Sequence, residues 1–277
     1  MELPYVVVDV FGDKPFSGNP VAVVYEADNL TTEQMQLIAQ WTNLSETTFL
    51  LRPTDSADYR VRIFTPRTEL PFAGHPTLGT AHAWLERSGS KQKTLWQECG
   101  AGLVELNNDG LLSFAAPPLI RSGEVESSTI ERIAYAFGIE SKKVINAQWV
   151  DNGPGWIAIE VSTAQEVIDL KPDFSKAPEL MVGVLGAYPA SSKAAYEVRV
   201  FGPREGVIED PVTGSFNAGV AQWLFAIGAQ RERYQVWQGR CVGRSGTVTL
   251  TAQSDGRSWV GGSTRTLAAG KIGRAHV

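Results

Sequence analysis

The sequence of 277 residues predicts an α+β protein built from two related halves. The stretch 61–67, Val-Arg-Ile-Phe-Thr-Pro-Arg, returns as 198–204, Val-Arg-Val-Phe-Gly-Pro-Arg. Each copy precedes a turn rich in Gly and Pro, and then an apolar helix that ends in a Trp-Leu pair. Short β-rich runs also outnumber helical runs, which argues against a doubly wound parallel sheet. A repeat that occurs only twice indicates two related domains, because a solenoid needs at least three units.

In the first half, a run of turn residues separates two expected strands, 6–11 and 21–25. Thr31 and Gln34 form a capping-box pattern, which predicts a helix over 31–42. A second helix is expected over 76–87. Further strands are expected at 45–51, 57–64, 94–97, 103–106 and 111–115.

The boundary between the halves is expected at Ala116-Pro117-Pro118, which gives domains 1–116 and 117–277. A last strand near 265–272 could return to the first domain. Ser128 with Glu131, and Thr163 with Glu166, form two more capping boxes ahead of helices. The other expected elements are strands at 182–187 and 195–201, a helix from 212 or 213 to 227, and closing strands around 236, 242, 248–250 and 259–260.

Composition narrows the class of protein. The net charge of −5 and the lack of a dense basic stripe argue against a nucleic-acid partner. The sequence contains no apolar run of about 20 residues, which argues against a membrane partner. The N-terminus lacks a signal-like core, so a cytoplasmic protein is expected. Cys99 and Cys241 stand alone, so neither a disulfide framework nor a metal site is expected. Phosphate-loop and dinucleotide patterns are missing, and no cofactor is expected.

The first candidate site lies where the helix of the first half begins. Pro76 is expected at the first helical position, beside free backbone donors that can bind an anion. His75 next to it would change charge near neutral pH. A lone His at this place is more often a structural cap. The repeat favours a functional role, because Asp210 stands in the matching turn of the second half.

The turn after Asp210 contains small residues and hydroxyls, Thr213, Gly214 and Ser215, beside the free amides of a helix start. Two such helix starts that face one cleft would hold a carboxylate. Glu209, the neighbouring acid, is expected at the surface or behind the site. His82, in mid-helix, is expected to be packed or to face solvent.

Glu46 is the third candidate, because it enters an apolar strand from an otherwise neutral run, 43–50. Desolvation of a carboxyl group favours its neutral form, which suits general acid-base catalysis. An exposed Glu at a strand end is an equally weighted alternative on the local pattern alone.

Together these residues give a resemblance that spans nearly the whole chain. The sequence resembles PhzF-like proteins, the phenazine-biosynthesis isomerase family, which is related in fold to diaminopimelate epimerase. The matching stretches, in order, are 9–11, 16–20, 44–47, 64–66, 74–79 and 210–215.

The resemblance implies that each half is a curved, barrel-like mixed sheet wrapped around a central helix, with the site between the halves. It implies a homodimer and a cofactor-free isomerase that moves a proton within a small carboxylate-bearing substrate, such as a dihydro-hydroxyanthranilate. Glu46 would be the acid-base residue, while His75 and Asp210 position the substrate and stabilise its charge. The implied substrate-binding residues are Asn19, Ser45, Gly74, Gly214 and Ser215.

Two alternatives stay open. One is an epimerase or racemase in which Glu46 works opposite His75 or Asp210; the two-thiol version is disfavoured because neither helix start contains a cysteine. The other is a non-catalytic protein that binds a ligand in the same cleft. The last six residues, 272–277, resemble translated sequencing-adaptor sequence, so His276 is left out of the site.

Overall fold

The computed structural model describes residues 2–54, 56–230 and 232–273. These residues form two compact units. The first unit contains 2–115 and 260–273, and the second contains 116–259. His276 and the rest of 274–277 lie outside the described residues, whereas Ile272 and Gly273 continue the last strand.

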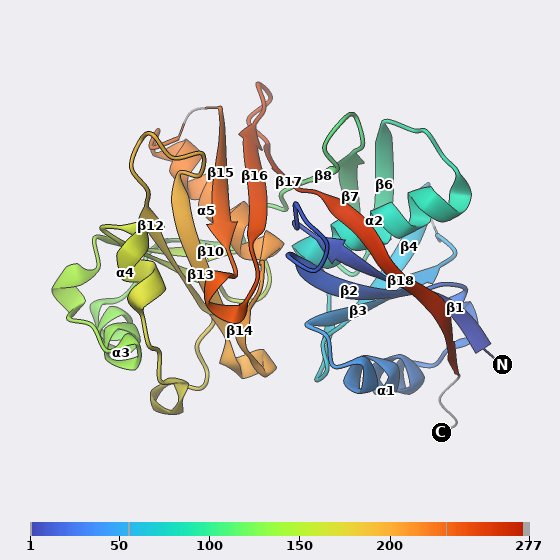
Figure 1. The fold of residues 1–277 in the computed structure, drawn as a ribbon, viewed down its shortest axis with the longest axis horizontal. Helices are drawn as coiled ribbons and strands as arrows, with labels where there is room; N and C mark the ends of the chain where they lie inside the picture. Colours follow the sequence, from blue (N-terminus) through green and yellow to red (C-terminus); the bar gives the residue numbers. More distant parts are fainter. Residues whose placement is uncertain (1, 55, 231, 274–277) are drawn as a thin grey trace. The chain divides into compact units, whose positions relative to one another are not determined.

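The first unit is a mixed sheet with two α-helices. Strand β1 pairs with β18 and β2, β2 runs parallel to β3, and β3 pairs with β4. Strand β4 then pairs with both β5 and β6, and β6 continues to β7 and β8. Figure 1 shows the last strand, in red, beside the first, in blue. The bounds are β1 (Glu2–Val10), β2 (Asn19–Val24), η1 (Ala27–Asn29), α1 (Thr32–Thr42), β3 (Glu46–Leu51), β4 (Tyr59–Phe64), β5 (Glu69–Leu70), α2 (Gly74–Ser88), β6 (Thr94–Cys99), β7 (Gly102–Asn107), β8 (Ser113–Ala115) and β18 (Thr264–Gly273).

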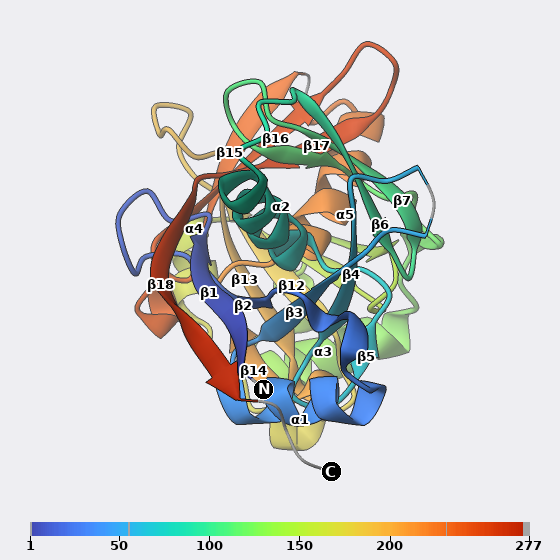
Figure 2. The ribbon, with the colours of Figure 1, turned by 90° about the vertical axis from the view of Figure 1, so that its right-hand side faces the viewer.

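Helix α2 is the central helix of this unit. It contacts strands along the whole curve of the sheet, from β18, β1 and β2 through β3 and β4 to β6 and β8, and Figure 2 shows it inside that curve. Gly79 permits the close approach, since a Cβ there would lie 2.3 Å from Cγ1 of Val21. The predicted fold of a curved sheet around a central helix is therefore confirmed. Helix α1 packs through Met35 and Ile38 in a separate apolar cluster with Leu3.

The helix starts of the first unit follow the sequence in part. Thr31 and Gln34 make the predicted capping box. Helix α2 begins at Gly74, so the expected start at Pro76 is wrong by two residues. Pro76 is the third helical residue, where an N–H would still have no partner within the helix.

The second unit repeats the topology of the first. Strands β10 and β11 are antiparallel, β11 and β12 are parallel, and β13 pairs with β12, β14 and β15 before β15 pairs with β16. Strand β9 pairs with β10. The bounds are β9 (Arg121–Glu124), α3 (Ser127–Phe137), η2 (Ser141–Lys143), β10 (Asn146–Asp151), β11 (Ile157–Val161), α4 (Ala164–Asp169), η3 (Phe174–Lys176), β12 (Val182–Ala187), β13 (Tyr196–Gly202), η4 (Pro203–Glu205), β14 (Val207–Asp210), α5 (Gly214–Ala226), β15 (Arg233–Gln238), η5 (Arg240–Val242) and β16 (Gly246–Ala252), while β17 (Ser258–Gly261) crosses the boundary between the units.

Helix α5 occupies the place in this unit that α2 has in the first. It contacts β10 and β16, and the Phe216 ring fills the space where a Cβ on Gly183 of β12 would lie. Helices α3 and α4 instead belong to an apolar cluster built around Phe137, Val167 and Phe201.

Two expectations for the second unit are corrected. Helix α3 begins at Ser127 after Glu126, and no side chain caps it, so the predicted Ser128 capping box is wrong. A Ser inside the first turn cannot have the extended backbone that an N-cap residue needs. Val242 lies in a 3-10 turn, not in a strand. The Thr163–Glu166 capping box is confirmed.

Across the described residues, none of the helices combines the length and the apolar character that a membrane crossing requires.

Candidate active site

The loop between β1 and β2 is organised by the buried carboxylate of Asp9. One oxygen accepts the N–H of Gly18 at 3.0 Å, and the other accepts the N–H of Ser17 at 3.2 Å. This fixes the start of β2, where Asn19 is fully buried. Nδ2 of Asn19 lies 3.3 Å from Nδ1 of His75 in the first turn of α2.

Glu46 and His75 meet at the other side of that imidazole. Glu46 is the first residue of β3, which the parallel register with β2 sets opposite Val21. Its Oε2 lies 3.4 Å from Nε2 of His75. This distance is long for a hydrogen bond, as catalytic contacts often are before substrate binds. The structure thus brings three residues that the sequence singles out, Asn19, Glu46 and His75, into one cluster.

His75 is neutral in this environment. Burial lowers its pKa from 6.5 to about 3, against a smaller opposing effect of the Pro20 backbone carbonyl. The expectation that His75 changes charge near neutral pH is therefore wrong, because no water solvates the ring when it is protonated. The contact with Glu46 is not an ion pair at neutral pH.

The hydrogen on the imidazole is set by what Nδ1 contacts. If the amide of Asn19 donates to Nδ1, the ring hydrogen is on Nε2 and points toward Glu46. The carbonyl of Pro20 can only accept, and it favours a hydrogen on the ring nitrogen that it meets. Asn19 and Pro20 are consecutive residues, so one short segment of β2 controls which nitrogen faces Glu46 as donor or acceptor.

The backbone around this cluster supplies hydrogen-bond donors. Gly74 and His75 are the first two residues of α2, and both are buried. The first N–H groups of a helix have no partner within the helix and can bind an anion. Ser45 is half-buried just before β3. The arrangement can hold a carboxylate at the helix start and exchange a proton through Glu46.

In the second unit the site residues come from β14 and the start of α5. Asp210 ends β14, and its Oδ2 accepts a hydrogen bond from Thr213 Oγ1 at 2.6 Å. Gly214 and Ser215 are the first two residues of α5. Oγ of Ser215 accepts the indole N–H of Trp156 at 3.0 Å, which leaves its own hydroxyl hydrogen to donate elsewhere.

The sequence repeat suggests that Asp210 is the counterpart of His75, but the structure does not align these two residues. Gly74 and Gly214 are both first helical residues, so Ser215 is the counterpart of His75. Asp210 instead stands four residues ahead of α5, in a strand. Glu209 is expected at the surface or behind the site; its side chain is 9% exposed, and both oxygens are bound by Arg199 at 3.0 and 2.7 Å.

Sequence reasoning missed several residues that support the site. Three side chains bind candidate residues or their direct neighbours: Asp9 accepts from Gly18, Trp156 donates to Ser215, and Gln238 accepts from Thr213. A signal was present for Gln238, since the pair Trp-Gln occurs at 96–97 and again at 237–238.

The two cysteines offer no nucleophile at either helix start. Cys99 ends β6 and Cys241 lies in η5, and burial raises the pKa of each thiol. A raised pKa keeps a thiol protonated and unreactive. In the described part of the chain, no group of three or more His, Cys, Asp and Glu side chains could hold a metal ion.

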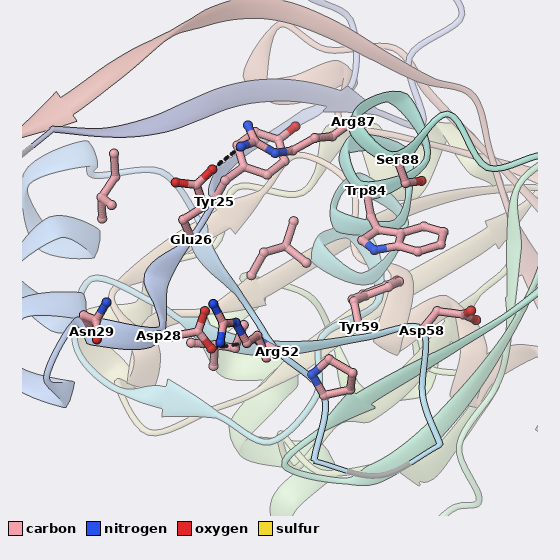
Figure 3. Close-up of a pocket in the computed structure, with 14 residues that line it drawn as sticks. Tyr25, Glu26, Asp28, Asn29, Arg52, Asp58, Tyr59, Trp84, Arg87 and Ser88 are labelled. Atoms are coloured by element: carbon pink, nitrogen blue, oxygen red, sulfur yellow. Dashed lines mark hydrogen bonds and ion pairs between the residues drawn. The ribbon is translucent and has the colours of Figure 1, made fainter.

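The first unit also contains a pocket of about 650 Å³, shown in Figure 3, whose lining includes none of Asn19, Glu46 and His75. It is lined by the end of β3, whereas Glu46 begins that strand. Its polar groups bind one another: Arg87 pairs with Glu26 and stacks on Tyr25, and the Arg52 amide donates to Asp28. The pocket therefore shows none of the acid-base chemistry of the Glu46–His75 cluster.

Known proteins resemble this chain in fold and in sequence along most of their length. A crystal structure of a PhzF-family phenazine biosynthesis protein from Enterococcus faecalis superposes with a TM-score of 0.81 at 26% identity, over 98% of this chain and 99% of that one. The Schizosaccharomyces pombe protein named antisense-enhancing sequence 1 is 38% identical over 95% of this chain and 96% of its own. Trans-2,3-dihydro-3-hydroxyanthranilate isomerase from Pseudomonas aeruginosa is 35% identical over 91% of each.

The repeated sheet-and-helix units and the similarity to proteins named isomerases place this two-unit protein in the isomerase and epimerase-like class. The family of phenazine biosynthesis-like proteins, PhzC-PhzF, matches residues 8–271. The chain belongs to this PhzF family.

Proposed function

We propose that this PhzF-family isomerase moves a proton between two carbons of a small carboxylate-bearing substrate, similar to a dihydro-hydroxyanthranilate, without a cofactor. The buried contact between Glu46 and neutral His75 is the observation that carries the proposal. Similarity to trans-2,3-dihydro-3-hydroxyanthranilate isomerase from Pseudomonas aeruginosa supports the substrate class.

In the proposed mechanism, Glu46 takes a proton from one substrate carbon and delivers it to another. A positioned general base of this kind contributes about 10²–10⁴-fold in rate. A carbon acid is weak, so the charge left behind must spread onto oxygen, where the N–H donors at the start of α2 stabilise it by a few kcal/mol. In the second unit, we assign binding of the substrate carboxylate to the start of α5 at Gly214 and Ser215, and positioning of the substrate's polar groups to Asp210.

His75 acts as the neutral partner of Glu46. Its pKa of about 3 means that the imidazole can donate or accept a hydrogen bond while its net charge stays zero. A neutral imidazole can contact Glu46 both when that carboxyl group is protonated and when it is ionised. A charged imidazolium would instead hold the carboxylate in its ionised form.

The geometry favours isomerisation over an epimerase that uses this pair. Epimerisation needs an acid and a base on opposite faces of one carbon. Glu46 and His75 are 3.4 Å apart, which leaves no room for a carbon between them. An epimerase that uses Glu46 and Asp210 is the remaining form of that alternative.

The test follows exchange and conversion of trans-2,3-dihydro-3-hydroxyanthranilate in D₂O by NMR and absorbance. We compare the wild type with Glu46→Gln, and use Glu86→Gln as the matched control. Glu86 also pairs with a histidine, His82, at 3.3 Å, but its side chain is 53% exposed. We expect Glu46→Gln to lose about 10²–10⁴-fold in rate and the control to keep wild-type activity.

Each other outcome points to a different function. Deuterium that enters a stereocentre with inversion would identify an epimerase. Binding without exchange would favour the non-catalytic alternative, and loss of activity in both variants would remove Glu46 from its assigned role.

We also propose that the protein works as a homodimer in the cytoplasm. Light scattering of the purified chain tests the first point, and cell fractionation tests the second.

A further inference from the structure

Each unit contains a buried glutamine that binds the central helix from a neighbouring strand. Gln97 is in β6 and Gln238 ends β15, each directly after a Trp, and their exposed fractions are 0% and 1%. Gln97 Nε2 donates to Thr77 Oγ1 at 3.0 Å. Gln238 Oε1 accepts from Asn217 Nδ2 at 3.0 Å. Thr77 and Asn217 are both the fourth residue of their helix, so the two glutamines have equivalent places.

Gln238 makes further contacts that Gln97 does not. Its Oε1 also accepts the backbone N–H of Thr213 at 3.1 Å. Its Nε2 donates to the Asp210 carbonyl at 3.1 Å and to Thr213 Oγ1 at 2.9 Å. Oε1 of Gln97 instead accepts a hydrogen bond from the Tyr59 hydroxyl at 3.2 Å.

These contacts fix the direction of the hydrogen bonds that run from Gln238 through Thr213 to Asp210. A backbone N–H can only donate, so the atom of Gln238 that meets Thr213 N must be the oxygen, and the amide cannot be flipped. Nε2 therefore donates to the Thr213 hydroxyl. That hydroxyl uses its own hydrogen toward Asp210 Oδ2, 2.6 Å away.

We propose that Gln238 is a positioning residue of the isomerase, which acts through Thr213 to orient the Asp210 carboxylate. The same side chain holds the Asp210 carbonyl and the Thr213 amide, so it also sets the backbone turn into Gly214 and Ser215. Its effect on turnover rests on the proposed function. Its effect on Asp210 does not.

The kinetic test compares Gln238→Met with Gln97→Met, which removes an equally buried amide at the equivalent place. A hydrogen bond that orients a charged group has a net value that corresponds to about 10–100-fold in rate. We expect Gln238→Met to lower kcat/KM by that factor, Thr213→Val to reproduce the loss, and Gln97→Met to stay within about threefold of wild type. In an Asp210→Asn background, Gln238→Met should cause a clearly smaller loss than in the wild type, because the part of its effect that passes through the Asp210 carboxylate is already gone.

The spectroscopic test needs no substrate. The carboxyl ¹³C signal of Asp210, identified by its absence in Asp210→Asn, should move in Gln238→Met and in Thr213→Val and stay in place in Gln97→Met. If the wild type converts no substrate, the proposed function fails, and this signal still decides the positioning role. An unmoved signal, equal kinetic losses at Gln97 and Gln238, or a full loss for Gln238→Met in the Asp210→Asn background would overturn the inference.

Discussion

The two units contain the same arginine–glutamate pair in two different environments. In the first unit Arg62 of β4 holds both oxygens of Glu69 in β5, at 2.7 and 2.6 Å. In the second, Arg199 of β13 holds both oxygens of Glu209 in β14, at 3.0 and 2.7 Å. The side chains of the first pair are 21% and 38% exposed, and those of the second are 6% and 9% exposed.

The less exposed pair of the second unit is held by more contacts than the pair of the first unit. Arg199 also donates to the carbonyls of Val167 and Leu170, at 3.2 and 2.7 Å, so its guanidinium is bound on several sides. Removal of one partner of a buried ion pair strongly destabilises the fold, because water does not solvate the charge that remains. The residue that follows Glu209 is Asp210, whereas Leu70 follows Glu69. In the second unit, the less exposed pair, Arg199 and Glu209, thus lies directly beside Asp210, the acid assigned to the site.

The largest expected effect compares Arg199→Met with Arg62→Met. The first should lower the free energy of unfolding by about 3–5 kcal/mol, because Glu209 is left as a buried charge. The second should cost about 1 kcal/mol or less, because water and salt already screen the pair. Urea midpoints measure both, with far-UV circular dichroism as the control for native structure. Equal losses would show that burial does not separate the two pairs.

A smaller effect separates the second residues of the two central helices, α2 and α5. His75 can titrate, while its counterpart Ser215 cannot. Below about pH 6.5 the unfolded chain binds a proton at this His, whereas the folded chain resists protonation down to about pH 3. The free energy of unfolding therefore falls as pH is lowered through this window. One group contributes about 2 kcal/mol of loss between pH 7 and pH 5.

Chemical denaturation of wild type, His75→Gln and Ser215→Ala at pH 7 and pH 5 measures that difference. We expect the pH-dependent loss to shrink by about 2 kcal/mol in His75→Gln and to stay at the wild-type value in Ser215→Ala. The same slope in all three proteins would mean that the imidazole is protonated in the folded state at pH 5.

Sequence patterns predict elements well where the signal is local. The capping boxes at Thr31 and Thr163 form as predicted, because a cap needs only the residues of one turn. The repeat predicts two related halves, the family resemblance implies a central helix in each, and the structure confirms that fold. Burial is different, because it depends on chain segments far apart in sequence. The neutral state of His75 follows from such packing and could not be read from its neighbours.

The smallest effect compares two helix starts that look alike in sequence, Thr31 of α1 and Ser128 of α3. Thr31 Oγ1 accepts the Gln34 N–H at 3.3 Å, and Gln34 returns a contact to the Thr31 N–H at 3.1 Å. Ser128 lies inside its helix, which no side chain caps. Thr31→Ala should therefore cost about 1 kcal/mol of unfolding free energy. Ser128→Ala should leave it unchanged or raise it slightly, since Ala is the better helix former. Thermal unfolding resolves both changes, and a matching loss in Ser128→Ala would mean that its hydroxyl caps the helix in solution.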